Sequence, residues 1–260
     1  MSGNVIAVQS VSPGVGKTVI AVNLAFELAS RGARVCLVDL DETWPSAHRY
    51  LGLPQQRASV LAAMRFVEQQ RLDANALEEI SYRVVARGAS IDFLSGYGLN
   101  LNPRAINLQS VGATLNSLSM RFDALVLDTA AGQDTPVAAA GISVARQSVL
   151  VTQPDAVTMG RFLEGQSAVP LAAATTLVIN RMRSSVLGAH PERQVQQVLR
   201  DQTSFRVATV ISEDPAFDSA TLQGLPLRMV APKSQALAAI AELGQRLQAS
   251  SADAGMLRAG

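Results

Sequence analysis

Residues 9–24, QSVSPGVGKTVIAVNL, decide the fold of this chain. A β-forming run, Val5 to Gln9, leads into a turn that contains glycine and closes with Gly16-Lys17-Thr18. The segment that follows, Val19 to Ser30, has apolar residues at helical spacing. A strand, a glycine-bearing turn that ends in Gly-Lys-Thr, and a helix together predict a phosphate-binding loop.

The turn carries the groups that a nucleoside triphosphate needs. Backbone N–H groups from Gly14 to Thr18 would face the β-phosphate, and the helix N-terminus would add partial positive charge. Lys17 would lie between the β- and γ-phosphates, and the hydroxyl of Thr18 would bind Mg²⁺. Of the 22 basic residues only Lys17 and Lys233 are lysines, so a chain that otherwise avoids lysine has one where such a loop requires it. The predicted nucleotide-binding loop comprises Gly14, Val15, Gly16, Lys17, Thr18 and Val19.

The composition predicts one domain. The 260 residues are 48% apolar, which is enough for a core on both faces of a sheet. We expect this domain over 1–249 and a loosely ordered tail over 250–260. A net charge of +1 gives no overall attraction to nucleic acid or anionic lipid. The single cysteine, Cys36, is expected to be buried, and no apolar stretch reaches the ~18 residues that span a bilayer, so we expect a soluble cytoplasmic protein.

Short apolar runs alternate with segments of helical spacing along the chain. Such continuous apolar runs are typical of parallel strands that are covered on both faces. We predict an α/β fold, a doubly wound, mainly parallel sheet with helices on both faces and ligands at the carboxyl ends of the central strands. The predicted strands are Val5 to Val8, Val35 to Val38, Ile91 to Leu94, Ala124 to Leu127, Ser148 to Thr152, Thr176 to Ile179 and Val207 to Ile211.

Acidic residues follow two of the predicted strands, and further motifs follow in a fixed order. The motifs are VDLD (38–41), FDALVLDTAAG (122–132), SVLVTQPD (148–155), LVINR (177–181) and ISEDPAFDSATLQGLPL (211–227). This ordered series, over nearly the full chain, resembles the ParA/MinD family of deviant Walker ATPases, P-loop NTPases of the SIMIBI type. The resemblance implies an ATPase that binds ATP and Mg²⁺ and forms an ATP-dependent homodimer.

The resemblance also implies roles for single residues. Asp39 would orient the water shell of Mg²⁺, Asp41 would position the attacking water, and Asp128 would complete the outer shell of the metal. Asn180 matches the asparagine that recognises adenine, and Arg181 beside it is included in the nucleotide site. The predicted metal site is therefore Thr18, Asp39 and Asp128, and the predicted catalytic residues are Lys17 and Asp41.

The loop departs from the family pattern at two positions. Family members have a further lysine that reaches the phosphates of the partner subunit, and here that position is Ser12, followed by Pro13. Serine supplies no charge, and proline removes one N–H donor. We therefore predict nucleotide binding with slow hydrolysis, and Arg161 and Lys233 are the residues suggested as replacements for the missing lysine.

Within the family, the stretch from Pro226 to Ser234 and the helix after it most resemble the CpaE/TadZ group. That group places Flp (tight adherence) pilus and secretion machinery, often at a cell pole, and tolerates degenerate phosphate loops. The receiver-like domain that usually precedes the ATPase is not found before the first strand, so we expect a short form or a receiver on a separate protein. The implied partners are pilus or secretion assembly proteins, and the implied position is a pole or septum.

Two alternatives belong to other classes. A ParA-like partitioning or cargo-positioning ATPase would bind non-specific DNA, but the candidate residues Arg181, Arg183, Arg193 and Arg200 are interspersed with acids. A MinD-like division-site regulator would attach to membranes through a C-terminal amphipathic helix. The stripe Leu237, Ile240, Leu243 and Leu247 has one basic neighbour, Arg246, so we expect it to pack inside the fold. A nitrogenase iron protein type is excluded, because it needs two cysteines per subunit.

Three further expectations concern surfaces. His48 is expected on the polar surface. Trp44 lies in a segment that should move with nucleotide state. The region 59–80 is where we expect a partner surface.

Overall fold

The computed structural model describes residues 2–54, 59–132, 135–183, 191–205 and 207–256. An eight-stranded sheet in the order β3-β4-β2-β5-β1-β6-β7-β8 forms its centre, and all neighbours except β3 and β4 are parallel. The predicted fold class is confirmed, and every predicted strand lies within an observed one. The strands are β1 (Asn4–Gln9), β2 (Val35–Leu40), β3 (Tyr82–Ala86), β4 (Ala89–Leu94), β5 (Ala124–Thr129), β6 (Gln147–Thr152), β7 (Ala174–Met182) and β8 (Val207–Ser212).

The sequence does not predict the edge strand β3. It pairs antiparallel with β4 through a tight turn in which Arg87 and Gly88 both have left-handed backbones (φ 43° and 80°). Such a turn matches the twist of a hairpin. The side chains of β3 alternate between more and less exposed positions, so the strand lacks the continuous apolar run by which the other strands are found.

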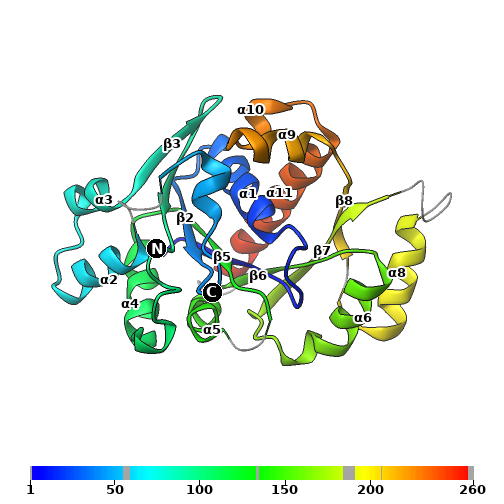
Figure 1. Cartoon of the computed structure of the whole chain (residues 1–260), viewed down its shortest axis with the longest axis horizontal. Helices are drawn as coiled ribbons and strands as arrows, with labels where there is room; N and C mark the ends of the chain where they lie inside the picture. The colour runs from blue at the N-terminus through cyan, green and yellow to red at the C-terminus, as the bar shows by residue number, and fades with distance from the viewer. Residues whose placement is uncertain (1, 55–58, 133–134, 184–190, 206, 257–260) are drawn as a thin grey trace.

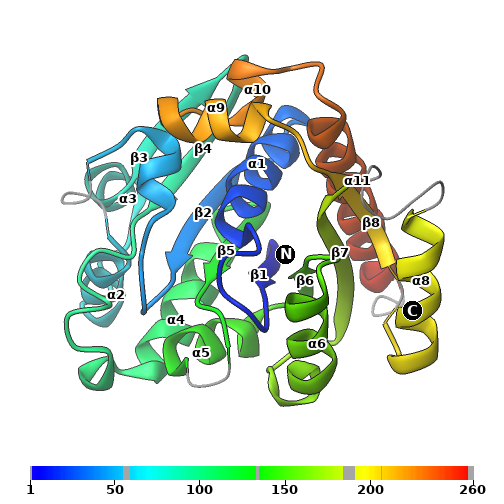
Figure 2. The same ribbon diagram turned by 45° about the vertical axis from the view of Figure 1, so that its right-hand side comes forward.

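Helices cover both faces of the sheet, as Figures 1 and 2 show. The layer that contains α1 also holds α9, α10 and α11, and α2 to α6 with α8 form the opposite layer. Short 3₁₀ turns, η1 (Ala47–Leu51), η2 (Pro103–Ala105) and η3 (Gln166–Ala168), complete the structure. The helices are α1 (Lys17–Ser30), α2 (Val60–Glu68), α3 (Ala74–Ile80), α4 (Leu108–Ser119), α5 (Pro136–Val144), α6 (Ala156–Gly165), α8 (Pro191–Gln202), α9 (Ala216–Gln223), α10 (Leu227–Val230) and α11 (Gln235–Met256).

Successive side chains of the central strands enter the two layers alternately. In β1, Ile6 and Val8 belong to the core under α1, whereas Val5 belongs to the core on the opposite face. In β5, Val126 and Leu125 separate in the same way. Both faces of these strands are therefore buried, which explains why their sequences are apolar without interruption.

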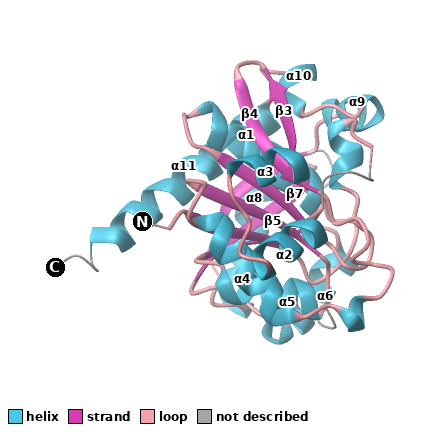
Figure 3. Cartoon of the chain, turned by 90° about the vertical axis from the view of Figure 1, so that its left-hand side faces the viewer, coloured by secondary structure: helices cyan, strands magenta, loops and turns pink. Residues whose placement is uncertain are grey.

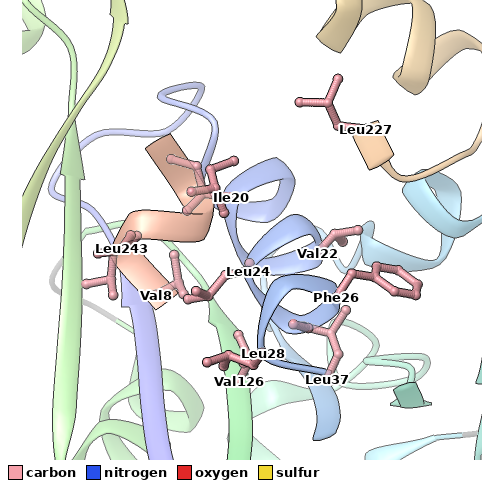
Figure 4. Packing of buried hydrophobic residues seen from close by; sticks show 14 of the residues in the cluster. Val8, Ile20, Val22, Leu24, Phe26, Leu28, Leu37, Val126, Leu227 and Leu243 are labelled. Carbon is pink, nitrogen blue, oxygen red and sulfur yellow. The ribbon is translucent and has the colours of Figure 1, made fainter. Parts of the chain in front are cut away.

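α1 lies in the middle of its layer and is buried over most of its length. Figure 4 shows Leu24 and Leu28 of α1 in the same cluster as Val8, Val126 and Leu243. The sheet therefore fixes α1 on one side, and α11 fixes it on another. This packing places the first turn of the helix at the carboxyl edge of the sheet, directly after β1.

The apolar stripe of α11 packs inside the molecule. Leu237, Ile240, Leu243 and Leu247 are each at most 7% exposed and share a core cluster with α1. The expectation that this stripe packs within the fold is confirmed, and so is the burial of Cys36.

The C-terminal stretch contains the end of α11, and the loosely ordered tail over 250–260 stays a prediction. α11 continues to Met256 and extends away from the body of the domain (Figure 3), while residues 257–260 lie outside the described part of the chain. A search of the described residues finds no helix with the length and apolar character that a membrane span requires.

The packing of α11 on α1 can be tested by truncating one side chain. Leu243→Ala removes a fully buried side chain from this contact, so we expect the free energy of unfolding to fall by about 2–5 kcal/mol in urea titrations. Leu222→Ala on α9 is the matched control, because Leu222 is 88% exposed and its truncation should change stability by less than about 0.5 kcal/mol. Equal effects of the two substitutions would contradict the packing.

Candidate nucleotide-binding site

The turn between β1 and α1 curves around the first turn of α1. Gly14 and Gly16 have left-handed backbones (φ 78° and 93°), and α1 begins at the residue after Gly16. A side chain at position 16 is unfavourable for a second reason, since its Cβ would lie 2.4 Å from Nδ2 of Asn180. The residues predicted to bind phosphate, Gly14 to Val19, therefore form one continuous loop and first helical turn.

The N-terminus of α1 differs from those of four other helices. The side chains of Ser59, Asp73, Asn107 and Asp155 accept hydrogen bonds from the first turns of α2, α3, α4 and α6. α1 is preceded by Gly16 and has no side-chain cap. The first N–H groups of a helix have no acceptor within it, so those of α1 can bind an anion, aided by the helix dipole.

Two aspartates end neighbouring strands beside this loop. Asp39 of β2 and Asp128 of β5 are paired in the register of the sheet, and both are fully buried. Asp39 accepts hydrogen bonds from the N–H groups of Asp41 and Ala47, each at 3.1 Å. Within the described part of the chain, no donor makes a geometrically acceptable hydrogen bond to either carboxylate oxygen of Asp128.

Burial dominates the electrostatics of these carboxyl groups. It raises the pKa of Asp39 well above its usual value, and the neighbouring Asp128 raises it further. Burial raises the pKa of Asp128 to about 7, although the ammonium of Lys17 and the hydroxyl of Thr18 lower it. Two carboxyl groups that ionise at such cost favour a cation beside them, because the cation would stabilise both in the charged form.

The arrangement suits a metal ion that is shared with phosphate. Across the ranges that the structure describes, no three His, Cys, Asp or Glu side chains gather into a metal site of their own. Mg²⁺ commonly takes one or two carboxylates and completes its shell with phosphate oxygens and water. Thr18, Asp39 and Asp128, which the structure brings together, match that pattern when a phosphate is bound nearby.

The segment after β2 folds back on itself and is tied to α5. Oδ1 of Asp41 accepts hydrogen bonds from the N–H groups of Thr43 (3.0 Å) and Trp44 (2.8 Å). Oε2 of the buried Glu42 accepts one from the N–H of Ala138, in the first turn of α5, at 2.7 Å. Glu42 thus links the segment that carries Asp41 to the helix that follows Asp128.

Sequence analysis overlooks Glu42, since a third acid after Asp-Leu-Asp resembles an exposed turn residue. The sequence carries no signal for it, because Thr135, before Pro136 at the start of α5, is of a type that commonly caps helices but makes no side-chain hydrogen bond here. A helix start of this kind needs an acceptor from elsewhere.

The structure also shows the surroundings of the three residues connected with the missing lysine. Ser12, at the position of the missing lysine, is 5% exposed, and its hydroxyl has no hydrogen-bond partner among the described residues. Lys233 lines a small cavity with Glu27, ten residues along α1 from Lys17 and so about 15 Å away. Within its own subunit Lys233 is therefore too far from Lys17 to take the place of the missing lysine, and its reach to the phosphates of a partner subunit stays a prediction. Arg161 is exposed on α6.

Two residues near the site have unexpected surroundings. His48, expected on the surface, is only 5% exposed on η1, and burial lowers its pKa. Arg181, the residue after Asn180, is exposed and has a left-handed backbone (φ 54°) that is uncommon outside glycine. Trp44 is 68% exposed beside Asp41, on the segment where it was expected.

Comparison with known proteins identifies the family. Residues 6–227 match the family described as the CobQ/CobB/MinD/ParA nucleotide binding domain. The chain belongs to this family. The matched range runs from β1 into α10 and includes every residue that the sequence assigns to the nucleotide and metal sites.

Individual relatives agree with this placement. The septum site-determining protein MinD of Synechocystis is 24% identical over 253 residues, which cover 94% of this chain and 89% of that protein. MinD of Bacillus subtilis is also 24% identical, over 255 residues, with the same coverage. The resemblance to the ParA/MinD family is thus confirmed, whereas its refinement to the CpaE/TadZ group stays a prediction.

Solved structures share the fold. A ParA family ATPase from Chlorobium tepidum matches with a TM-score of 0.79 at 19% identity, over 94% of this chain and 99% of that one. MinD of Pyrococcus horikoshii, solved with Mg-ADP, has a TM-score of 0.72 at 21% identity, over 94% and 96%. MinD of Aquifex aeolicus, solved in a complex with MinC, has a TM-score of 0.74 at 21% identity, over 95% and 96%.

The burial of Glu42 predicts how the stability of the protein depends on pH. Burial raises the pKa of Glu42 above its ordinary value of 4.5, so the folded state keeps the proton to higher pH than the unfolded state. The free energy of unfolding should therefore fall as the pH rises from 4.5 through the raised pKa, and Glu42→Gln should flatten this slope.

Two substitutions of Glu42 separate the effect of its charge on stability from the effect of its hydrogen bond. Glu42→Gln keeps an oxygen that accepts from Ala138, whereas Glu42→Ala leaves the first turn of α5 without that acceptor. We expect the Gln variant to exceed the Ala variant in stability by about 1 kcal/mol in denaturant titrations. Equal stability of the two variants would show that the hydrogen bond contributes nothing.

Proposed function

We propose that this protein is a nucleotide switch that binds ATP with Mg²⁺, hydrolyses ATP slowly and forms a homodimer around it. The observation that carries the proposal is the uncapped N-terminus of α1 beside the buried pair Asp39 and Asp128. A free helix N-terminus attracts phosphate, and two costly carboxylates attract a divalent cation. Mg-ATP supplies both ligands together. The Mg-ADP bound to the MinD of P. horikoshii supports this choice.

The roles of the residues follow from their positions. N–H groups from Gly14 to Thr18 bind the β-phosphate, and Lys17 neutralises charge between the β- and γ-phosphates. Thr18, Asp39 and Asp128 hold Mg²⁺, which neutralises phosphate charge when bound. Asp41 uses only Oδ1 in its own turn, so Oδ2 can position the attacking water. Asn180, whose side chain contacts the loop at Val15, and Arg181 beside it are proposed to bind the base and sugar.

Slow hydrolysis follows from the sequence of the loop. Ser12 offers no positive charge to the phosphates of a partner subunit, and its side chain is buried. Charge that develops on the γ-phosphate is then offset without a cation from position 12, and electrostatic stabilisation is the main source of catalysis in phosphoryl transfer. Nucleotide state would change the surface that carries Trp44 and the helices within 59–80, which we propose as the partner surface.

The switch would position a cellular assembly by recruiting another protein, as the MinC:MinD complex illustrates for a relative. We propose the Flp/Tad pilus or secretion machinery as this assembly, supported by the stretch from Pro226 to Ser234. A MinD-like role at the division site is the second candidate and is supported at least as well, because the relatives that cover most of the chain are MinD proteins.

Two observations bear on how such a protein would be anchored. The apolar stripe of α11 is buried against α1, so it does not offer an apolar face to a membrane. Arg183, one of the candidate DNA-binding residues, is paired with Glu213. We therefore expect no sedimentation with anionic vesicles in the presence of ATP and no salt-dependent shift of non-specific DNA. Sedimentation would favour the MinD-like role, and a DNA shift would favour the partitioning role.

The two lysines of the chain provide a matched pair for testing nucleotide binding. Lys17→Ala should weaken Mg-ATP binding on the order of 10- to 100-fold in calorimetric titrations, since a charge-assisted contact to phosphate is lost. Lys233→Ala should leave the dissociation constant unchanged, because Lys233 lies at the far end of α1. Wild-type protein that shows no affinity for Mg-ATP would end the proposal.

The role of Asp41 predicts a separation of binding from turnover. Asp41→Asn keeps the backbone turn but loses the carboxylate that positions water, so we expect hydrolysis to fall by about a hundredfold or more. ATP affinity should change little. In size-exclusion chromatography with light scattering, the variant should remain a dimer in ATP for longer than wild type. A variant that hydrolyses ATP at the wild-type rate would exclude Asp41 from this role.

A further inference from the structure

We propose that the side-chain amides of Asn180 and Gln153 position the phosphate loop, a role separate from recognition of the base. The inference rests on the proposed nucleotide site and adds to it. It assigns to two strand-end residues the task of setting the direction in which the N–H groups of the loop point.

The side chain of Asn180 contacts the phosphate loop directly. It is 5% exposed, and its Nδ2 donates a hydrogen bond to the carbonyl oxygen of Val15 at 2.8 Å. The same amide approaches Gly16 so closely that a Cβ there would lie 2.4 Å away. The loop and the end of β7 are therefore fitted to each other at two consecutive residues.

Gln153 makes a second contact of the same kind. Its Nε2 donates to the carbonyl oxygen of Gly14 at 3.3 Å. β6 and β7 are parallel neighbours with Thr152 opposite Ile179, so Gln153 and Asn180 are the next residues in line on the two strands. Asn180 within β7 and Gln153 directly after β6 thus hold two consecutive carbonyl groups of the loop.

The geometry of the peptide bond gives these contacts a consequence. In a planar trans peptide, the C=O of one residue and the N–H of the next point in opposite directions. The hydrogen bond from Gln153 fixes the oxygen of Gly14 toward β6, so the N–H of Val15 points away from β6. In the same way, the hydrogen bond from Asn180 fixes the oxygen of Val15 toward β7, so the N–H of Gly16 points away from β7. Because Pro13 supplies no N–H, the direction of these remaining donors matters more in this loop.

The two roles of Asn180 use different atoms. Nδ2 serves the loop, whereas Oδ1 accepts no hydrogen bond from the described residues and can face the base. A ligand without a base separates the roles. If the amides position the loop, their loss must weaken binding of inorganic tripolyphosphate with Mg²⁺ as much as binding of ATP. If Asn180 acts on the base alone, tripolyphosphate binding must stay unchanged.

The experiment measures displacement of a fluorescent ATP analogue by ATP and by tripolyphosphate, with the full chain and Mg²⁺. We expect Gln153→Ala to weaken both ligands by the same factor, about three- to tenfold, and Asn180→Asp to weaken both by more, since the donor is replaced by a charge facing a carbonyl. Gln166→Ala is the matched control, because Gln166 makes a similar bond, to Leu163 at 3.2 Å, away from the loop. It should change neither affinity.

The melting temperature without nucleotide distinguishes positioning from a loss of folding. We expect Gln153→Ala to melt within the range of the control variant. Variants that retain wild-type affinity for tripolyphosphate would overturn the inference and leave the nucleotide site intact. Wild-type protein that binds neither ligand would instead overturn the proposed function. Should Asn180→Asp fail to fold, Asn180→Ser supplies the same comparison.

Discussion

Two carboxylates buried side by side at the ends of β2 and β5 are the constraint on which the rest of the site depends. Asp39 and Asp128 face each other because the register of parallel strands places them there. Neither can ionise cheaply in an apolar interior, and Asp128 lacks hydrogen-bond donors of acceptable geometry within the described chain. The fold therefore holds two carboxyl groups whose charged forms a cation beside them would stabilise.

The hydrophobic core offsets the cost of burying Asp39 and Asp128. It also fixes the position of the residues beside them, at the start of α1. α1 is enclosed by the sheet and α11, so its first turn cannot withdraw from the carboxyl edge. Lys17 and Thr18 are consequently kept beside Asp128, where the ammonium stabilises its charged form. In the proposed function, phosphate at the uncapped end of α1 and a cation at the acidic pair would assist each other, because each would neutralise the charge that the other brings.

The sequence predicts the central architecture well because buried parallel strands have an unambiguous pattern. It fails where the pattern depends on a neighbour that is distant along the chain. β3 alternates in exposure as an edge strand does, and His48 is buried by packing of η1 that no local motif encodes. Glu42 contacts α5 and Gln153 contacts the phosphate loop, and both contacts form only when the chain folds. The residues from Gly14 to Val19 are found early since strand, turn, lysine and helix adjoin in sequence.

The acidic segment is also connected, through η1, to the layer that contains α9. Asp39 accepts a hydrogen bond from the N–H of Ala47 at the start of η1, and η1 is followed by Gly52, which has a left-handed backbone (φ 62°). A Cβ at Gly52 would lie 3.0 Å from the carbonyl oxygen of Gly224, so η1 and the end of α9 are in close backbone contact. A continuous series of contacts thus connects Asp39 through η1 to the end of α9, so the acidic segment and this helix are fixed relative to each other by close packing.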